Sequence, residues 1–292
     1  MQTQKQMVGQ PSATRLRATL FRRVTEFLAP IQQGWQYDQK FDSAWALQNA
    51  VVEVAKTLKS TGWSAYLVGG TLRDLIVEPG NRPFEPRDVD IIVRGPTREE
   101  LQDALEESLV LERLTRFGGL HMSRSLSSGS RVLFDVWTLA DHWGFQSQQI
   151  APQIENFPGT TFLNIDSCAV ELQEPAGRER ALYEKGFYAG MADGALELNY
   201  APNPYPYVCA VRTLLLAAEL NFTIGRPLAK FILDHTAAGG VEALIEAQLS
   251  HYGAVHGDTA QLEIWLHEVR HQFDGGEDHI ALRARGAQEP RP

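Results

Sequence analysis

Residues 65–93, AYLVGGTLRDLIVEPGNRPFEPRDVDIIV, restrict the possible folds of this chain more than any other stretch. The apolar, β-prone run 65–68 stops at Gly69 and Gly70, where glycine lets the backbone turn sharply. Residues 71–76 then show the apolar spacing of a helix. The pattern predicts a strand, a glycine turn and a helix start, and the free N–H groups of such a helix end suit phosphate.

A second predicted strand, residues 88–93, carries two carboxylates. Asp88 and Asp90 are separated by one residue, so the alternation of a strand places both on the same face. Adjacent carboxylates repel each other unless a cation lies between them, and oxygen-only ligands favour Mg²⁺. A phosphate-binding turn beside a pair of metal-binding acids predicts nucleotidyl or phosphoryl transfer.

A third acid lies in the predicted strand 131–137, whose sequence is RVLFDVW. Alternation places Asp135 on the face opposite to Val132, Phe134 and Val136. A charged residue in the middle of a strand is costly to bury without a partner. We therefore expect Asp135 to point toward the same metal ions as the two acids of the second strand, with a purely structural acid as the alternative.

The sequence Leu67-Val68-Gly69-Gly70 with Arg73-Asp74, followed by Asp88-Val89-Asp90, resembles the head domain of class II nucleotidyltransferases. These are the bacterial poly(A) polymerases and CCA-adding tRNA nucleotidyltransferases of the DNA polymerase β superfamily. Their third carboxylate also follows a glycine-containing hairpin, as Asp135 does here. The resemblance covers residues 65–139 and continues more weakly over 161–225. It implies an α+β fold, with a small mixed β-sheet head flanked by helices and then an all-helical neck and body region.

The resemblance also implies an activity and a set of site residues. The chain would be a metal-dependent nucleotidyltransferase that moves a nucleoside monophosphate from an NTP to an acceptor hydroxyl, with an RNA or tRNA 3′ end as the acceptor. Two Mg²⁺ ions would activate that hydroxyl and stabilise the departing pyrophosphate. The metal ligands would be Asp88, Asp90 and Asp135, and the triphosphate would contact Gly69, Gly70 and Arg73. Asp74 is expected to pair with a nearby arginine or to fix the turn rather than to bind metal.

Two regions depart from the family pattern. The predicted strand 161–172 stands where the family has an arginine-aspartate-phenylalanine-threonine-isoleucine-asparagine-alanine motif, but no arginine precedes Phe162. Asn164 stands for the family's asparagine and would share a strand face with Asp166, so both could contact the ribose; two polar edge residues are the alternative. The predicted helix 208–220 resembles the family's neck helix, in which arginines select the base.

In that helix Leu215 takes the place of one such arginine, which leaves Arg212 as the candidate to face the nucleotide or to pair with a carboxylate. The organisation predicted for the chain is an N-terminal extension with a helix over 1–42, a head domain over 43–175, a helical neck and body over 176–275 and a disordered tail over 276–292. Within it we expect a helix over 182–191, a flexible loop over 144–160 and a structural role for His142.

The composition of the chain bears on its cellular location and on its binding partners. The 292 residues contain two cysteines, too few for a disulfide framework, and neither a secretory signal nor a membrane-spanning run is evident. We expect a cytoplasmic protein that binds no membrane; its oligomeric state does not follow from the sequence. The net charge of −9 gives no general affinity for nucleic acid. A protein or small-molecule acceptor is therefore an alternative, as is a non-catalytic nucleotide-binding module on the same fold.

Overall fold

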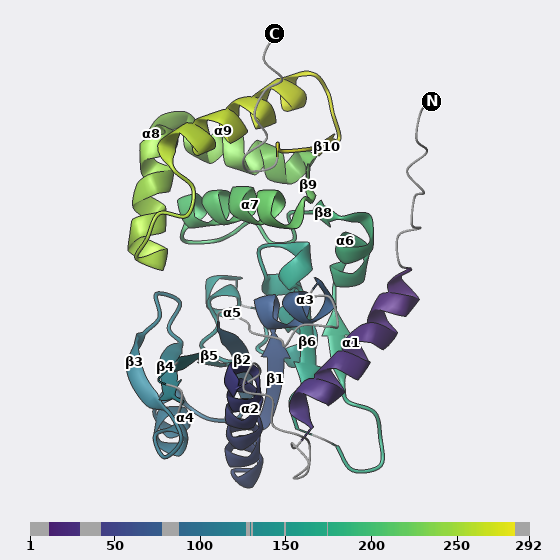
Figure 1. Ribbon diagram of the computed structural model, residues 1–292, viewed down its shortest axis with the longest axis vertical. Coiled ribbons are helices and arrows are strands. Elements are labelled where there is room, and N and C mark those ends of the chain that lie inside the picture. The colour runs from purple at the N-terminus through teal and green to yellow at the C-terminus, as the bar shows by residue number, and fades with distance from the viewer. Residues whose placement is uncertain are drawn as a thin grey trace. The chain divides into compact units, whose positions relative to one another are not determined.

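The computed structural model describes residues 12–29, 42–77, 88–126, 129, 131–148, 150–173 and 175–283 (Figure 1). Residues 284–292, which make up most of the predicted disordered tail, lie outside this set. The described parts of Thr19–Phe187 form one compact unit, and those of Met1–Ala18 and Tyr188–Pro292 form another. None of the described helices is both long and apolar enough to cross a membrane.

A seven-stranded mixed sheet forms the centre of the first unit, with the strand order β3-β4-β5-β2-β1-β6-β7. The β2–β5 pair is parallel, whereas β1 is antiparallel to both β2 and β6. This mixed sheet with flanking helices confirms the predicted α+β class. The strands are β1 (Ser64–Val68), β2 (Val89–Arg94), β3 (Val110–Leu114), β4 (Leu120–Ser125), β5 (Arg131–Thr138), β6 (Cys168–Glu171) and β7 (Leu182–Glu184).

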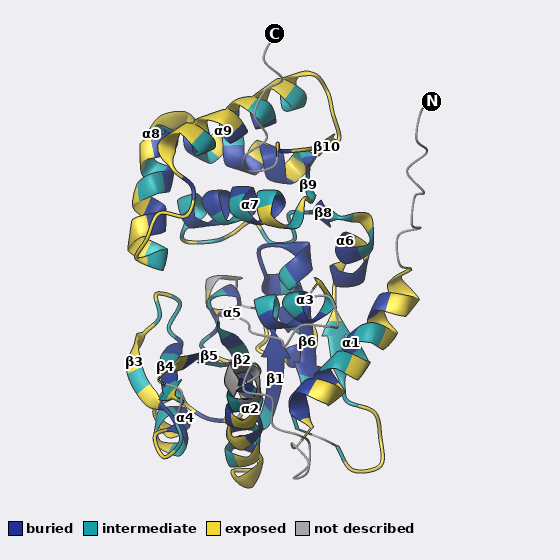
Figure 2. Ribbon diagram, in the orientation of Figure 1, coloured by how far each residue is buried: buried dark blue, intermediate teal, exposed yellow. Residues whose placement is uncertain are grey.

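Strands β1 and β6 are buried on both faces, which Figure 2 shows as dark blue ribbon. One face packs Tyr66 and Ile92 against Phe145, Ile154 and Phe157 from the segments that follow β5. The other face consists of fully buried aliphatic and aromatic side chains of β1, β2 and β5. Because α2 (Asp42–Ser60) and α4 (Arg98–Leu105) contact each other and also contact β1 and β5, respectively, we infer that they cover this second face.

The helices of this region have the apolar spacing and the caps that stabilise helices. Helix α1 (Ala13–Leu28) buries Leu16, Leu20 and Val24 at helical intervals. Helix α4 starts at a capping box, in which the Thr97 side chain accepts from the Glu100 N–H and the Glu100 carboxylate accepts from the Thr97 N–H. Helix α3 (Gly69–Val77) starts directly at the end of β1.

Three predicted segments differ from the structure. Residues 182–191 were expected to form one helix. Residues 182–184 instead form β7, because they make strand hydrogen bonds with β6, and the helix α6 (Phe187–Asp193) begins only after it. The expected loop 144–160 contains α5 (Trp143–Gln148) and the 3₁₀ segment η2 (Ile154–Thr160), which pack on the sheet. The expected strand 161–172 is limited to β6, preceded by the 3₁₀ segment η3 (Asn164–Asp166).

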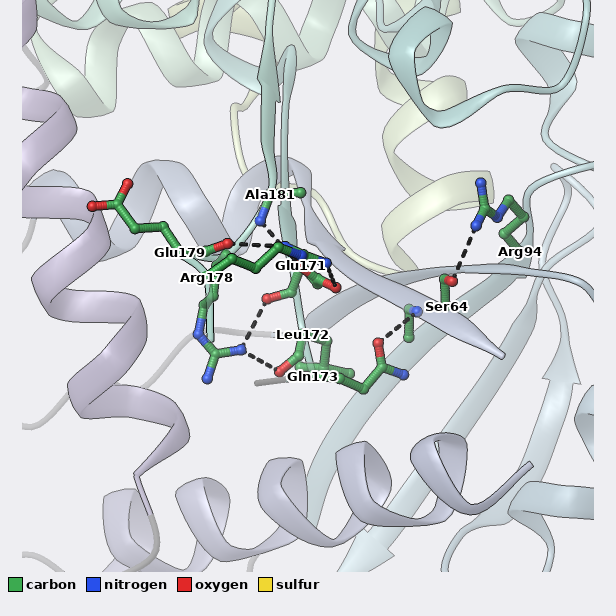
Figure 3. Close-up of polar contacts among 10 residues, drawn as sticks. Ser64, Arg94, Glu171, Leu172, Gln173, Arg178, Glu179 and Ala181 are labelled. Carbon is green, nitrogen blue, oxygen red and sulfur yellow. Dashed lines mark hydrogen bonds and ion pairs between the residues drawn. The ribbon is translucent and has the colours of Figure 1, made fainter. Parts of the chain in front are cut away.

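A network of hydrogen bonds and ion pairs fixes the position of the residues that follow β6 (Figure 3). The Gln173 amide accepts from the Ala65 N–H and donates to the Trp63 carbonyl. Arg178 donates twice to the Glu171 carboxylate, at 2.8 and 2.9 Å, while Arg180 donates to backbone carbonyls of the same strand end. These bonds hold Gln173, Arg178 and Arg180 against the ends of β1 and β6 that lie far from the glycine turn.

The second unit is mainly helical, with a short three-stranded sheet of order β10-β9-β8. The long helical element α8 (Arg226–Tyr252) is interrupted at Gly240, whose backbone is non-helical at φ 59° and ψ −158°. The elements are α6, β8 (Ala195–Leu196), α7 (Pro206–Leu220), β9 (Thr223–Gly225), α8 (Arg226–Tyr252), α9 (Thr259–Asp274) and β10 (His279–Ile280).

His142 is a buried structural residue, as predicted. Its ring lies within aromatic contact of Trp143, Phe145 and Phe157, and its Nδ1 accepts from the Gly144 N–H at 3.3 Å. Burial lowers the pKa of His142 from 6.5 to about 3. The unfolded chain therefore binds a proton at this position in a pH range where the folded chain does not.

The first prediction follows from this proton linkage. Between pH 6.5 and about 3, the range set by the two pKa values of His142, protonation favours the unfolded state. This residue should thus lower the free energy of unfolding by roughly 1.4 kcal/mol per pH unit as the pH falls. Urea unfolding at pH 7.0, 5.5 and 4.5 should show a shallower loss for His142→Asn than for the wild type. His267→Asn, at an exposed histidine, should keep the wild-type slope. Parallel curves for wild type and His142→Asn would contradict the prediction.

Candidate active site

The glycine turn between β1 and α3 lies directly against the second strand. Gly69 has a φ of +60°, a left-handed conformation that favours glycine. A Cβ atom placed on Gly69 would lie 3.1 Å from Oδ2 of Asp90, so the backbone and the carboxylate approach closely. The turn predicted from the sequence is therefore confirmed, and it brings the N-terminal end of α3 next to the second acid of the Asp88-Val89-Asp90 segment.

Thr71 connects the start of α3 to the backbone of this acidic segment. Its buried hydroxyl accepts from the Asp90 N–H at 3.1 Å and donates to the Asp88 carbonyl at 3.5 Å. Both bonds join residues that are 17 to 19 positions apart in the chain. The position of the two acids relative to the glycine turn is thus fixed by a side chain that the sequence analysis did not single out.

The strand register aligns four polar residues in one row across the sheet. Asp90 of β2 is the Cα partner of Asp135 of β5, which is in turn the partner of His121 of β4. His121 is also the partner of Arg113 on the edge strand β3. Because directly opposite residues of neighbouring strands point to the same face, Asp90 and Asp135 share a face, as predicted.

The environment of Asp135 is that of an acid lacking sufficient counter-charge. Its oxygen Oδ1 lies 2.5 Å from Nδ1 of His121. Burial raises the pKa of the Asp135 carboxyl above its ordinary value; the hydrogen bond from His121 lowers it in part, and the negative charge of Asp88 raises it again. Asp88 therefore acts electrostatically on Asp135, and a cation between the two acids would remove this repulsion.

These carboxylates are suitable ligands for a hard divalent cation, because they supply only oxygen atoms. Within the described part of the chain, however, no three His, Cys, Asp or Glu side chains are gathered closely enough to hold a metal ion. Asp135 is directed to His121 in this arrangement, and Asp88 precedes the first residue of β2. The assignment of Asp88, Asp90 and Asp135 as metal ligands stays a prediction.

Arg73 is engaged with carboxylates rather than open to solvent. Its Nε donates to Asp74 at 2.8 Å and one terminal nitrogen donates to Asp166 at 3.0 Å, with only 9% of its side chain exposed. The pairing of Asp74 with an arginine is confirmed. The second bond connects α3 to η3, and the guanidinium folds back over Gly70, where a Cβ would lie 3.2 Å from it.

Asn164 and Arg212 are the remaining predicted nucleotide contacts. Asn164 begins η3 rather than lying on a strand, and its buried side chain accepts from the Ile165 N–H at 2.9 Å. The shared strand face expected for Asn164 and Asp166 is therefore wrong, because a 3₁₀ turn does not alternate. Arg212 lies half-buried on α7 of the second unit. The nucleotide contacts of both residues stay predictions.

Three residues of the site were not predicted from the sequence or were predicted only in another role. His121 lies in a segment that reads as a strand broken by glycines, and no motif marks it. Thr71 is a small polar residue at a helix start, and Asp166 was considered only as a ribose contact. One signal was present for His121. It lies between Leu120 and Met122, so the alternation of a strand places it on the face opposite to these apolar residues.

The comparisons with known proteins find similar structures but no similar sequences. No family model and no curated protein matches the chain. The structure of the Thermotoga maritima CCA-adding enzyme complexed with tRNA is similar, with a TM-score of 0.52 and 17% identity over 86% of this chain and 54% of that one. A CCA-adding enzyme in complex with CTP gives 0.54 and 17% over 88% and 55%. A tRNA-processing enzyme without ligand gives 0.51 and 18% over 87% and 60%.

At this level of identity the likeness shows the fold alone. The chain spans about half the length of these solved structures. The fold is nevertheless the one that the sequence resemblance implies.

The second prediction concerns the buried ion pairs of Arg73. Its partner Asp166 is only 14% exposed, so Arg73→Met leaves a buried carboxylate without its counter-charge. We expect a loss of about 3 kcal/mol in the free energy of unfolding, the cost typical of breaking a buried pair. Adding Asp166→Asn should restore part of this loss. Urea denaturation of both variants measures the two effects.

The matched control is Arg22→Met, which removes an ion pair with Glu26 whose side chains are 61% and 55% exposed. Such a surface pair contributes little, so the expected change is below about 1 kcal/mol. If the double variant is no more stable than Arg73→Met, the carboxylate of Asp166 does not depend on this arginine.

Proposed function

We propose that this chain is a metal-dependent nucleotidyltransferase that transfers a nucleoside monophosphate from an NTP to an acceptor hydroxyl. The observation that supports this best is the direct register of Asp90 with Asp135 beside the Gly69 turn. It puts two acids on one face of the sheet at the N-terminal end of a helix, where a phosphate would be received. The raised pKa of Asp135 supports a cation at this place.

The roles of the residues follow from their positions. Gly69 and Gly70 supply backbone N–H groups without side chains that would keep a phosphate away. Asp88, Asp90 and Asp135 would hold the metal. Bound Mg²⁺ supplies charge neutralisation and activation of the acceptor oxygen. Thr71 keeps the acidic segment aligned with the turn through its two hydrogen bonds.

An RNA 3′ end, and specifically that of a tRNA, is the proposed acceptor. The support is the fold similarity to CCA-adding enzymes, one of which was solved with tRNA and another with CTP. The net charge of −9 supplies no general attraction for RNA, so acceptor binding would depend on a local basic surface. Arg212 is the proposed residue of the helical region that contacts the base of the nucleotide.

One observation favours a second candidate, a module that binds a nucleotide without turning it over. Arg73 is already neutralised by Asp74 and Asp166, and no three-ligand metal site is preformed in the described part of the chain. Such a module would bind an NTP with Mg²⁺ but would release no pyrophosphate. The same assay distinguishes the two functions.

The third prediction is the test of this function. Incubation with Mg²⁺, each of the four labelled NTPs and total cellular RNA should release pyrophosphate and label an RNA product. Asp90→Asn should lower the rate by at least about 100-fold, because even changes in the outer shell of a metal site cost 10- to 100-fold. Its thermal unfolding should stay close to that of the wild type.

The matched control is Asp103→Asn, at an exposed acid of α4, which should keep full activity. Full activity of Asp90→Asn would refute the assignment of the acids. NTP binding by the wild type without pyrophosphate release would instead favour the nucleotide-binding module.

A further inference from the structure

Among the described residues at the proposed phosphate site, the arginine of the motif is already neutralised. Arg73 is buried and bonded to two carboxylates, at 2.8 and 3.0 Å. The neighbouring acids Asp88, Asp90 and Asp135 add negative charge. A triphosphate adds further negative charge, so a cation supplied by the protein, in addition to any metal ion, would favour binding at the Gly69–Gly70 turn.

Lys185 lies at the end of the sheet where this turn begins. Val68, the last residue of β1, is the Cα partner of Ala169 in β6, and Cys168 is the partner of Glu184 in β7. The pairing of these two chain segments extends to Ser167 and Lys185, because the Lys185 N–H donates to the Ser167 carbonyl at 3.0 Å. Neighbouring strands are separated by about 4.8 Å, which places the backbone of Lys185 roughly 10 Å from the glycine turn.

The side chain of Lys185 belongs to the face of the sheet that carries the acids. Tyr183, two residues earlier, packs edge-on against Tyr66 of β1 with 6.1 Å between ring centroids. Tyr66 is the partner of Ile92, which lies two residues after Asp90 on β2. Lys185 follows the last residue of β7, and its side chain passes beside Gly159 of η2, which packs on the face of Tyr66 and Ile92. Because Asp90 and Ile92 are two residues apart on β2, they share this face.

The backbone around Lys185 is held firmly while its ammonium group remains exposed. The Ser167 hydroxyl donates to the Lys185 carbonyl at 2.6 Å. A Cβ on Gly159 would lie 3.7 Å from the ammonium nitrogen, so the segment just before η3 passes close beside it. The ammonium group forms no ion pair with any residue that the structure describes.

Two acids near Lys185, Glu184 in the sequence and Asp166 beside its hydrogen-bond partner Ser167, bind other groups. The Glu184 carboxylate accepts from the Phe187 N–H at 3.1 Å, at the start of α6. Asp166 is bonded to Arg73. A lysine on a rigid backbone, on the acid-bearing face and beside occupied carboxylates has the properties of an anion-binding residue.

We propose that the ammonium group of Lys185 binds the phosphate chain of the nucleotide at the Gly69–Gly70 turn and supplies the positive charge that Arg73 does not. This inference rests on the proposed function for the identity of the ligand. Its own content is narrower: a polyphosphate binds at this end of the sheet, and Lys185 contacts it.

The fourth prediction tests this contact by binding rather than by turnover. Isothermal titration of the full chain with inorganic tripolyphosphate, and with each NTP and Mg²⁺, should show binding to the wild type. Lys185→Met should weaken both affinities by at least about tenfold, the effect of losing one charged hydrogen bond. Lys185→Arg should retain most of the affinity. Lys59→Met, an equal loss of charge on an exposed position of α2, should bind like the wild type.

The outcomes separate this inference from the proposed function. Equal affinities of Lys185→Met and Lys59→Met overturn the role of Lys185, even if the wild type transfers nucleotides. The absence of any binding to the wild type overturns the polyphosphate site itself. Weaker binding by Lys185→Met in a chain that releases no pyrophosphate supports Lys185 and rejects the transferase.

Discussion

The position of β2 between β1 and β5 is the constraint on which the rest of the candidate site depends. Its antiparallel pairing with β1 brings the acidic segment back to the glycine turn, while its parallel pairing with β5 aligns Asp90 with Asp135. A shift of one residue in the second register would turn Asp135 to the opposite face, among buried aliphatic side chains. Register is therefore the property of the sheet that decides whether these acids can act together.

Charge is distributed unevenly over this end of the sheet. The acids of β2 and β5 have His121 and Arg113 in the same row, whereas Arg73 is turned inward to Asp74 and Asp166. The inward ion pairs connect α3 with η3 and so support the turn mechanically. Under the proposal made above, Arg73 supports the fold while Lys185, an exposed cation, binds the ligand.

Several features could be predicted from the sequence because short-range physics determines them. The glycine turn, the alternation around Asp135, the capping box of α4 and the break at Gly240 each follow from a few neighbouring residues. The errors fall where pairing over a distance decides. Residues 182–184 have a helical pattern but form β7, because β6 offers a free edge for hydrogen bonding. Residues 164–166 were expected to be extended, but they turn, and Asp166 meets Arg73 across 93 positions of the chain.

The sequence by itself determined the class of the fold, the strand-turn-helix unit at Gly69 and the face of each acid along its own strand, because these depend on local backbone preference and on the period of a strand. Only the tertiary structure decided which residues meet. The contact of His121 with Asp135, the two hydrogen bonds of Thr71, the burial of Arg73 and the place of Lys185 all join segments far apart in the chain. Such contacts depend on strand order and register, which arise from packing of the whole sheet and are not encoded in any single stretch of residues.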